Sequence, residues 1–125
     1  MLWLLNRATR DAIYYLSWID YFNNLLLHNY FFEDTAYDLV GFTKINQQLF
    51  AVVEQKFVEI TDKTDLTNVR EFMIANGFDC IRNNDYINKE LGIILEDLHD
   101  ENVLTKDGLL YFIDTVFYLE DNFWN

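Results

Sequence analysis

Apolar residues follow two different patterns along this chain, and each pattern predicts a different kind of element. From Ala12 to Tyr30 they recur every three or four residues, which predicts an amphipathic helix that Asn6 or Thr9 can cap. The predicted apolar face of this helix comprises Ala12, Leu16, Ile19, Phe22, Leu26 and Tyr30. The preceding apolar residues, Leu2–Leu5, have no period of their own and are either the end of a strand or a segment that docks on the core.

Two stretches rich in β-branched and aromatic residues come next. They are Tyr37–Ile45 and Leu49–Ile60, and the polar residues Asn46-Gln47-Gln48 separate them. This pattern predicts an antiparallel hairpin. The polar residues Thr61–Thr64 are expected to form a linker after it.

A second helix is predicted after the linker. It begins at Asp65 or Thr67 and ends near Asn76, with a glycine just past its end as a stop signal. Phe78–Ile81 is expected to be a short strand, and Arg82–Asp85 a turn. The four residues after that turn receive no assignment.

The last third of the chain alternates between short apolar runs and polar turns. In order it holds a run (Leu91–Leu95), a polar loop (Glu96–Asn102), a second run (Val103-Leu104), a turn (Lys106-Asp107-Gly108) and a third run (Leu109–Ile113). Short apolar runs bounded by turn signals predict buried strands, and Asp-Gly between two of them predicts a hairpin. Asp97, Asn102 and Asp114 therefore lie at strand ends, where a scaffold can bring three oxygen-bearing side chains together.

These three residue types suit phosphoryl transfer. The reaction needs a carboxylate to orient the attacking hydroxyl, and oxygen ligands to hold magnesium against the phosphates. Asn102 follows Asp97 by five residues, as the metal-binding Asn follows the catalytic Asp in kinases, and Asp114 comes next at a plausible distance. A site of Asp and Asn oxygens suits magnesium or manganese rather than zinc. Taken singly, Asp97 and Asn102 are better explained as residues that cap turns, and Asp114 as an exposed strand end; only the three together, in order and at this spacing, favour a site.

The sequence EDLHDENVL, at residues 96–104, followed by FID, at residues 112–114, resembles the catalytic loop and metal-binding Asp of the protein-kinase-like fold. The segments LHNYFF, YDLVGF, AVVEQKF and ANGF precede it, and the whole pattern over roughly residues 27–119 resembles the kinase domain of bacterial and phage polyvalent proteins. The resemblance implies ATP and Mg as cofactors, with Asp97 as catalytic base and Asn102 and Asp114 as metal ligands. It implies a structural role for His99 beside the Asp.

The implied fold is α+β, a C-terminal protein-kinase-like fragment in a single domain over residues 1–125. Its elements are a long N-terminal helix, an antiparallel hairpin, a hinge, a helix and the catalytic-loop hairpin. At the hinge, backbone groups would hold adenine, and the candidates are Val53, Glu54, Gln55, Lys56 and Phe57. A plain hairpin explains these residues about as well. The first helix stands where the family's C helix would be, but its only acids are Asp11 and Asp20, and neither is expected to pair with a phosphate-holding Lys. His28 is expected to be packed or capping.

Parts of a complete kinase are absent from these 125 residues. The four glycines lie far apart, so there is no glycine-rich phosphate loop, and no Lys precedes Lys44. Three hypotheses remain open. The chain is part of a kinase domain that an upstream segment or partner completes, a non-catalytic pseudokinase-like module that binds protein, or a plain α+β domain.

Charge and composition limit the classes of molecule that the chain is expected to bind. The formal net charge of −12, with nine scattered basic residues, argues against nucleic acid. A nucleotide, a protein partner or a second copy of the chain remains open. Cys80 is the only cysteine, which excludes an internal disulfide. No apolar run is long enough to span a bilayer and no signal peptide is evident, so a cytoplasmic protein without a membrane partner is expected.

Overall fold

The computed structural model describes residues 2–5, 17–121 and 123. The chain forms two compact units, Met1–Phe57 and Val58–Asn125. In the described residues, helices and antiparallel strands occur together in each unit, so the predicted α+β class is confirmed. The finer prediction, a kinase-like fragment, is compatible with this element order.

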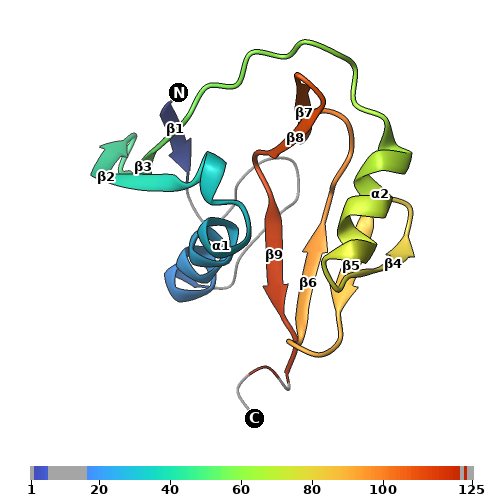
Figure 1. The fold of residues 1–125 in the computed structure, drawn as a ribbon. Coiled ribbons are helices and arrows are strands. Elements are labelled where there is room, and N and C mark those ends of the chain that lie inside the picture. Colours follow the sequence, from blue (N-terminus) through green and yellow to red (C-terminus); the bar gives the residue numbers. More distant parts are fainter. Residues whose placement is uncertain (1, 6–16, 122, 124–125) are drawn as a thin grey trace. The chain divides into compact units, whose positions relative to one another are not determined.

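The first unit contains a three-stranded antiparallel sheet in the order β1-β3-β2 (Figure 1). Its elements are β1 (Leu2–Leu5), α1 (Trp18–Phe31), the short 3-10 helix η1 (Glu33–Thr35), β2 (Tyr37–Ile45) and β3 (Gln48–Gln55). The apolar N-terminal residues are therefore a strand, the first of the two predicted alternatives, and they pair with β3.

The predicted hairpin is present as β2 and β3. Its turn consists of Asn46 and Gln47, which have φ angles of 51° and 67°, and Ile45 pairs with Gln48 across it. Two positive φ angles match the right-handed twist of the flanking strands, and Asn tolerates them well. The predicted end of the second strand at Ile60 was wrong, because residues 56–60 lie outside any strand.

The first helix begins later than predicted. Ser17 is extended, with φ −148° and ψ 166°, and its side chain accepts a hydrogen bond from the backbone N–H of Asp20. A serine in this position is a favourable N-cap, so the helix starts at Trp18 rather than at Ala12. The predicted caps Asn6 and Thr9, and the first predicted turn of the helix, lie outside the described residues.

The predicted buried face of this helix was also wrong. Ile19, Leu26 and Tyr30 are 73%, 66% and 75% exposed. The buried side chains are Tyr21, Asn24, Leu25 and His28. Two of these four are polar, so a search for apolar periodicity could not find this face.

The second unit contains a four-stranded antiparallel sheet in the order β4-β5-β6-β9, a separate β7–β8 hairpin, and one helix. Its elements are α2 (Leu66–Ala75), β4 (Asp79–Arg82), β5 (Asp85–Asn88), β6 (Ile93–Glu96), β7 (Val103–Lys106), β8 (Leu109–Phe112) and β9 (Val116–Leu119). The four residues without a prediction thus include most of β5. The predicted loop, hairpin and turn of the last third are all present.

The predicted second helix agrees closely with α2. The carboxylate of Asp65 accepts a hydrogen bond of 2.9 Å from the backbone N–H of Thr67, and Gly77 ends the helix with φ 90°. Val69 and Met73, both 1% exposed, form the buried face of the helix. The ring of Phe72 packs against that of Phe112, with 5.3 Å between the ring centroids, and this contact joins α2 to β8.

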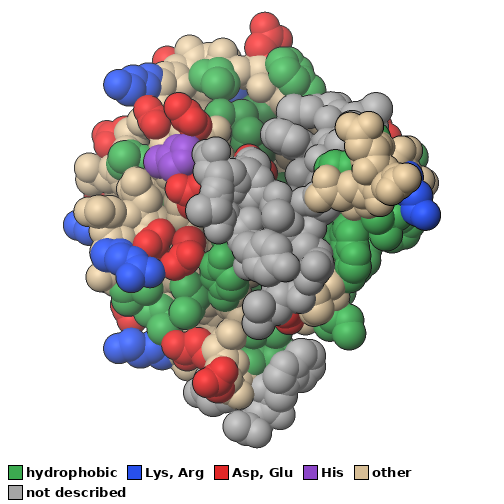
Figure 2. All heavy atoms as spheres, turned by 180° about the vertical axis from the view of Figure 1, so that it is seen from behind, with side chains coloured by type: hydrophobic (Ala, Val, Ile, Leu, Met, Phe, Trp, Pro, Cys, Tyr) green, Lys and Arg blue, Asp and Glu red, His purple; other side chains and the backbone are tan. Residues whose placement is uncertain are grey.

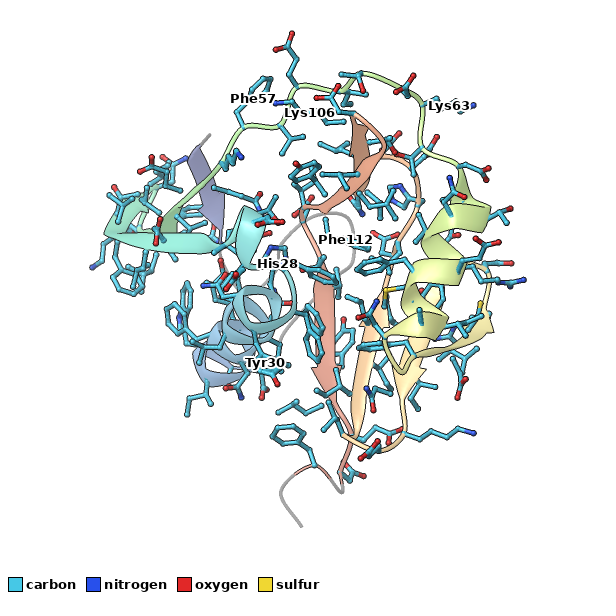
Figure 3. All side chains as sticks on the ribbon, in the orientation of Figure 1. His28, Tyr30, Phe57, Lys63, Lys106 and Phe112 are labelled. Atoms are coloured by element: carbon cyan, nitrogen blue, oxygen red, sulfur yellow. The ribbon has the colours of Figure 1, made fainter. Side chains whose placement is uncertain are left out.

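Part of the predicted linker is attached to β7. The backbone N–H of Thr61 donates to the carbonyl of Thr105 at 3.0 Å, and the hydroxyl of Thr64 donates to the carbonyl of Val103 at 2.6 Å. The linker residues from Thr61 onward therefore belong structurally to the second unit. Phe57 lies at the other end of this connection, on the stretch leading out of β3 (Figure 3).

Candidate active site

Two strand ends and a hairpin end meet in the second unit. The last residue of β6, Glu96, pairs with the first residue of β9, Val116. Asp97 follows Glu96 directly, and Asp114 precedes Val116 by two residues. Both aspartates therefore lie at the same end of the β6–β9 pair. Beyond the open end of the β7–β8 hairpin, the backbone N–H of Ile113 donates to the carbonyl of Asn102 at 2.9 Å. The three predicted site residues therefore occupy one neighbourhood.

Asn102 joins the two ends of the loop that contains it. Its side-chain Nδ2 donates to the backbone carbonyl of Asp97 at 2.8 Å and lies 3.3 Å from the carboxylate Oδ2 of the same residue. A carbonyl oxygen only accepts, so the amide nitrogen must face Asp97 and the amide Oδ1 must face away from that carbonyl. No described residue donates a hydrogen bond to this oxygen. The Oδ1 of Asn102 is therefore available as an oxygen ligand.

His99 lies beside the carboxylate of Asp97. The backbone N–H of Glu101 donates to His99 Nδ1 at 3.2 Å. His99 Nε2 lies 3.2 Å from Asn102 Nδ2 and 3.3 Å from Asp97 Oδ1. The imidazole is therefore beside one carboxylate oxygen of Asp97, and Asn102 Nδ2 is beside the other. The carboxylate is oriented, yet its side chain remains 38% exposed to a reactant.

Both aspartates adopt a left-handed backbone conformation. Asp97 has φ 71° and Asp114 has φ 55°. Neither occupies a two-residue hairpin turn, where such angles are routine. Residues other than glycine rarely adopt this conformation, although Asp and Asn tolerate it better than most, and it occurs often at functional sites. The uncommon left-handed conformation thus occurs at the two positions that carry the candidate carboxylates.

The β4–β5 turn and the first residue of β5 hold the start of the loop. The backbone N–H of Asp97 donates to Asp85 Oδ1 at 3.0 Å, and the backbone N–H of Leu98 donates to the carbonyl of Asn84 at 3.0 Å. The sequence predicted only a turn at these positions. No pattern in the sequence separates an Asp that contacts a distant loop from an Asp that stabilises its own turn, so Asp85 was missed.

A single arginine links the carboxylates behind the loop. Arg82 Nε donates to Asp85 Oδ2 at 2.7 Å, and Arg82 Nη2 donates to Glu96 Oε2 at 2.9 Å. The hydrogen bond to Asp85, followed by that to Glu96, raises the pKa of the Arg82 guanidinium. On the face displayed in Figure 2, Lys and Arg side chains lie apart from one another among more numerous carboxylates.

The residues at this position have the chemistry of a magnesium site. Within the described part of the chain, no three His, Cys, Asp or Glu side chains group closely enough to hold a metal. The predicted donors are instead one amide oxygen, from Asn102, and the carboxylate of Asp114, with Asp97 nearby. Hard oxygen donors in this small number fit Mg²⁺, which keeps several waters and binds phosphate oxygens as well. The residue types present are those that Mg²⁺ prefers, and their role as ligands stays a prediction.

The predicted hinge residues fall at the boundary between the two units, which lies after Phe57. Because β3 is the central strand, the backbone groups of Val53 and Glu54 face the neighbouring strands β1 and β2. The side chain of Gln55 is buried and donates to the carbonyl of Thr35 at 2.8 Å. The prediction of an adenine contact therefore depends mainly on the backbone after the strand, at Lys56 and Phe57, whose side chains are exposed.

His28 is a packed side chain, as predicted. It is fully buried, and its Nε2 donates to the carbonyl of Thr35 at 2.9 Å (Figure 3). Burial lowers its pKa from 6.5 to about 4, although the hydrogen bond to Thr35 opposes this shift. The imidazole is therefore neutral at physiological pH. Asp20 is exposed at the start of α1, and Asp11 lies outside the described residues.

A comparison with models of known protein families shows which family this chain belongs to. A model of the serine/threonine/tyrosine kinase domain found in polyvalent proteins matches residues 5–121. The chain belongs to this polyvalent-protein kinase family. The match spans both units and includes residues 96–104 and Asp114. Searches of curated proteins and of solved structures give no match to the chain.

Membership of the polyvalent-protein kinase family confirms the resemblance on which the site residues were predicted, and supports a kinase-like function. The roles of the individual residues stay predictions. No helix in the described part of this family member has the length and apolar character needed to cross a membrane.

Proposed function

We propose that this chain is a partial kinase domain that binds ATP with Mg²⁺ and transfers its terminal phosphoryl group once another segment or chain supplies the missing phosphate-holding groups. The observation that supports this most is the position of Asp97 and Asp114 at one end of the β6–β9 pair, with Asn102 between them in sequence and bonded to Asp97. These are the oxygen donors that phosphoryl transfer requires.

In this proposal Asp97 acts on the phosphate acceptor. Its carboxylate accepts the proton of the attacking hydroxyl and orients that hydroxyl toward the phosphorus. His99 and Asn102 each face one oxygen of this carboxylate, so the carboxylate loses little rotational freedom when the acceptor binds. The hydroxyl-binding geometry is then present before the substrate arrives.

Asn102 and Asp114 are the proposed metal ligands. A bound Mg²⁺ supplies neutralisation of the charge on the transferring phosphate oxygens. Asn102 contributes its amide Oδ1, the atom that faces away from the Asp97 carbonyl, and Asp114 contributes its carboxylate. An acidic chain with a net charge of −12 repels free nucleotide, and a bound cation would reduce this repulsion.

The missing groups define what must complete the site. These residues contain no glycine-rich loop and no Lys before Lys44. Donors of that kind act mainly on the phosphates in the transition state, and removing one such donor often costs about a hundredfold or more in rate. We therefore expect nucleotide binding by the chain itself, and efficient transfer only with an additional segment or partner.

Calorimetric titration of the chain with ATP, with and without Mg²⁺, tests the proposal. Binding should require Mg²⁺, and Asp114→Ala should weaken it by about tenfold or more, an effect at least as large as loss of an outer-shell partner of a metal ligand. The matched control is Asp100→Ala, which removes an exposed carboxylate from the same loop and should leave binding unchanged. Absence of binding at millimolar nucleotide would contradict the proposal.

A non-catalytic protein-binding module is the second candidate. The observation that favours it is the exposed apolar side of α1, where Ile19, Leu26 and Tyr30 lie on one side of the helix at helical spacing. This candidate predicts that nucleotide does not bind and that replacing these three residues with Ser leaves the fold intact while a protein partner is lost. Nucleotide binding that depends on Asp114 would favour the kinase instead.

A further inference from the structure

We infer that Asp85, the first residue of β5, is a positioning residue that holds Asp97 in its left-handed conformation at the start of the proposed catalytic loop. The inference rests on the proposed function for its consequence, but its structural content concerns only hydrogen bonds inside the second unit. It adds a residue to the site that the catalytic-loop sequence does not contain.

Asp85 contributes a charged acceptor to a backbone donor. Its Oδ1 accepts from the backbone N–H of Asp97 at 3.0 Å, and its side chain is only 20% exposed. A hydrogen bond from a backbone N–H to a partly buried carboxylate is stronger than one between neutral groups. It fixes the peptide plane immediately before Asp97, and therefore the φ angle of 71° at that residue.

A second hydrogen bond acts on the next peptide. The carbonyl of Asn84 accepts from the backbone N–H of Leu98 at 3.0 Å, and the Leu98 side chain is 1% exposed. Two successive N–H groups of the loop therefore donate to the adjacent residues Asp85 and Asn84. The Asp97 N–H belongs to the peptide before the Asp97 Cα, and the Leu98 N–H to the peptide after it. The two hydrogen bonds together therefore fix both peptide planes, whereas one bond would fix only one of them.

Arg82 fixes the orientation of the Asp85 carboxylate. Its Nε donates to Asp85 Oδ2, the oxygen that Asp97 does not use, at 2.7 Å. Its Nη2 also donates to Glu96, the residue immediately before Asp97. The carboxylate is thus held on both oxygens, and the three side chains connect β4, the start of β5 and the end of β6.

The consequence concerns reactivity at Asp97. A left-handed Asp between a strand and a loop has several alternative conformations of lower backbone energy. Loss of Asp85 would let the Asp97 peptide rotate, and the carboxylate would move relative to Asn102 and Asp114. A displacement on the scale of 1 Å at a reacting group is enough to reduce catalysis by orders of magnitude.

The wild-type chain allows a direct test by NMR. A scalar coupling across the hydrogen bond, between the amide ¹⁵N of Asp97 and the carboxylate ¹³Cγ of Asp85, should be detectable. The matching coupling between the Leu98 ¹⁵N and the Asn84 carbonyl carbon is the internal positive control. If the second coupling is present and the first is absent, the inference is wrong, and no variant needs to fold for this result.

Amide hydrogen exchange in variants gives the second measurement. Asp85→Ala should speed exchange at the Asp97 amide by about tenfold or more, because the N–H loses a charged acceptor. Asp85→Asn keeps an acceptor oxygen and should restore most of the protection. The control is Asp79→Ala, which removes an exposed carboxylate from β4 and should leave Asp97 unaffected. Equal exchange in Asp85→Ala and Asp79→Ala would overturn the inference.

Nucleotide titration separates this inference from the proposed function. If the wild-type chain binds ATP with Mg²⁺, Asp85→Ala should weaken that binding and Asp79→Ala should not; equal binding by both would contradict the functional part of the inference. If the wild-type chain does not bind nucleotide, the proposed kinase function fails, and the NMR measurements still decide whether Asp85 holds Asp97.

Discussion

Asn102 contacts both of the residues that precede it in the candidate loop, Asp97 and His99. Its side chain is 5% exposed, donates to the Asp97 carbonyl and lies within 3.3 Å of both Asp97 Oδ2 and His99 Nε2. It therefore has two functions in one side chain. The amide nitrogen holds the loop closed, and the amide oxygen is the proposed metal ligand.

Replacing Asn102 with Ala should therefore affect stability as well as nucleotide binding. We expect the free energy of unfolding to fall by about 1–2 kcal/mol, because the Asp97 carbonyl loses its partner in a partly buried position. Urea denaturation followed by circular dichroism measures this change. Asn68→Ala, an exposed position on α2, should not be destabilising. A loss of nucleotide binding with unchanged stability would mean that the hydrogen bond to Asp97 contributes little.

His28 makes the stability of the chain dependent on pH. Its pKa is about 4 in the folded protein and near 6.5 when unfolded, so between these values the unfolded state binds more protons. The stability contribution is present above pH 6.5 and is lost as the pH falls toward 4. The shift corresponds to roughly 3 kcal/mol over this range.

Denaturation of the wild-type chain and of His28→Gln at several pH values between 7 and 4 measures this contribution. Glutamine does not titrate, so the difference between the two free energies of unfolding should change across this range, while the carboxylates common to both cancel. The NMR chemical shift of the His28 ring gives its pKa independently. Parallel pH profiles would show that His28 is not responsible.

At the scale of elements, α2 depends on its N-terminal cap. Asp65 accepts from the Thr67 N–H and carries a negative charge at the positive end of the helix dipole. We expect Asp65→Ala to lower the free energy of unfolding by about 1 kcal/mol. Glu71→Ala removes the same charge from the exposed middle of the helix and should change stability much less. Similar losses for both variants would indicate a general charge effect rather than capping.

Elements defined by local signals were predictable, and elements defined by packing were not. Asp65 and Gly77 mark the two ends of α2 in the sequence itself, and Asp107-Gly108 marks the turn between β7 and β8. The face of α1 was predicted wrongly because its buried side includes the polar residues Asn24 and His28, which a search for apolar spacing does not find, and its start because Ser17 caps the helix. Local chemistry indicates where an element ends, whereas its buried face depends on what packs against it.

The same distinction applies to the candidate site. The sequence indicated Asp97, Asn102 and Asp114 because they belong to a known loop pattern at fixed spacing. It did not indicate Asp85, which precedes Asp97 by twelve residues and reaches it only because β5 pairs with β6. Residues that act on a site through strand pairing carry no mark in the local sequence.

At the scale of the whole molecule, the two units are joined by one short connection. The chain between β3 and α2 forms no helix or strand, but from Thr61 onward it is hydrogen-bonded to Thr105 on β7. Lys56 and Phe57 precede that attachment and are exposed. Side chains are exposed along both halves of the connection, and what distinguishes the second half is its hydrogen bonding to β7.

Limited proteolysis of the full chain should show this difference. Among the basic residues described, trypsin should cleave first after Lys56. Lys63 should be cleaved later, because the backbone N–H groups of Thr61 and Asp62 before it and the hydroxyl of Thr64 after it are hydrogen-bonded to β7. Mass spectrometry of early time points identifies the sites. Lys106, in the hairpin, is the internal comparison for a residue in regular structure. Initial cleavage after Lys63 or Lys106 would contradict the assignment of the connection.

The direct pairing of Glu96 with Val116 has a consequence for substitutions in the segment between them. Everything between them, the catalytic loop and its hairpin included, is an excursion from one strand to its immediate neighbour. β6 and β9 pair directly, and the segment between them contributes no strand to the four-stranded sheet. Replacement of the acidic residues in this segment would therefore leave the β6–β9 pairing in place.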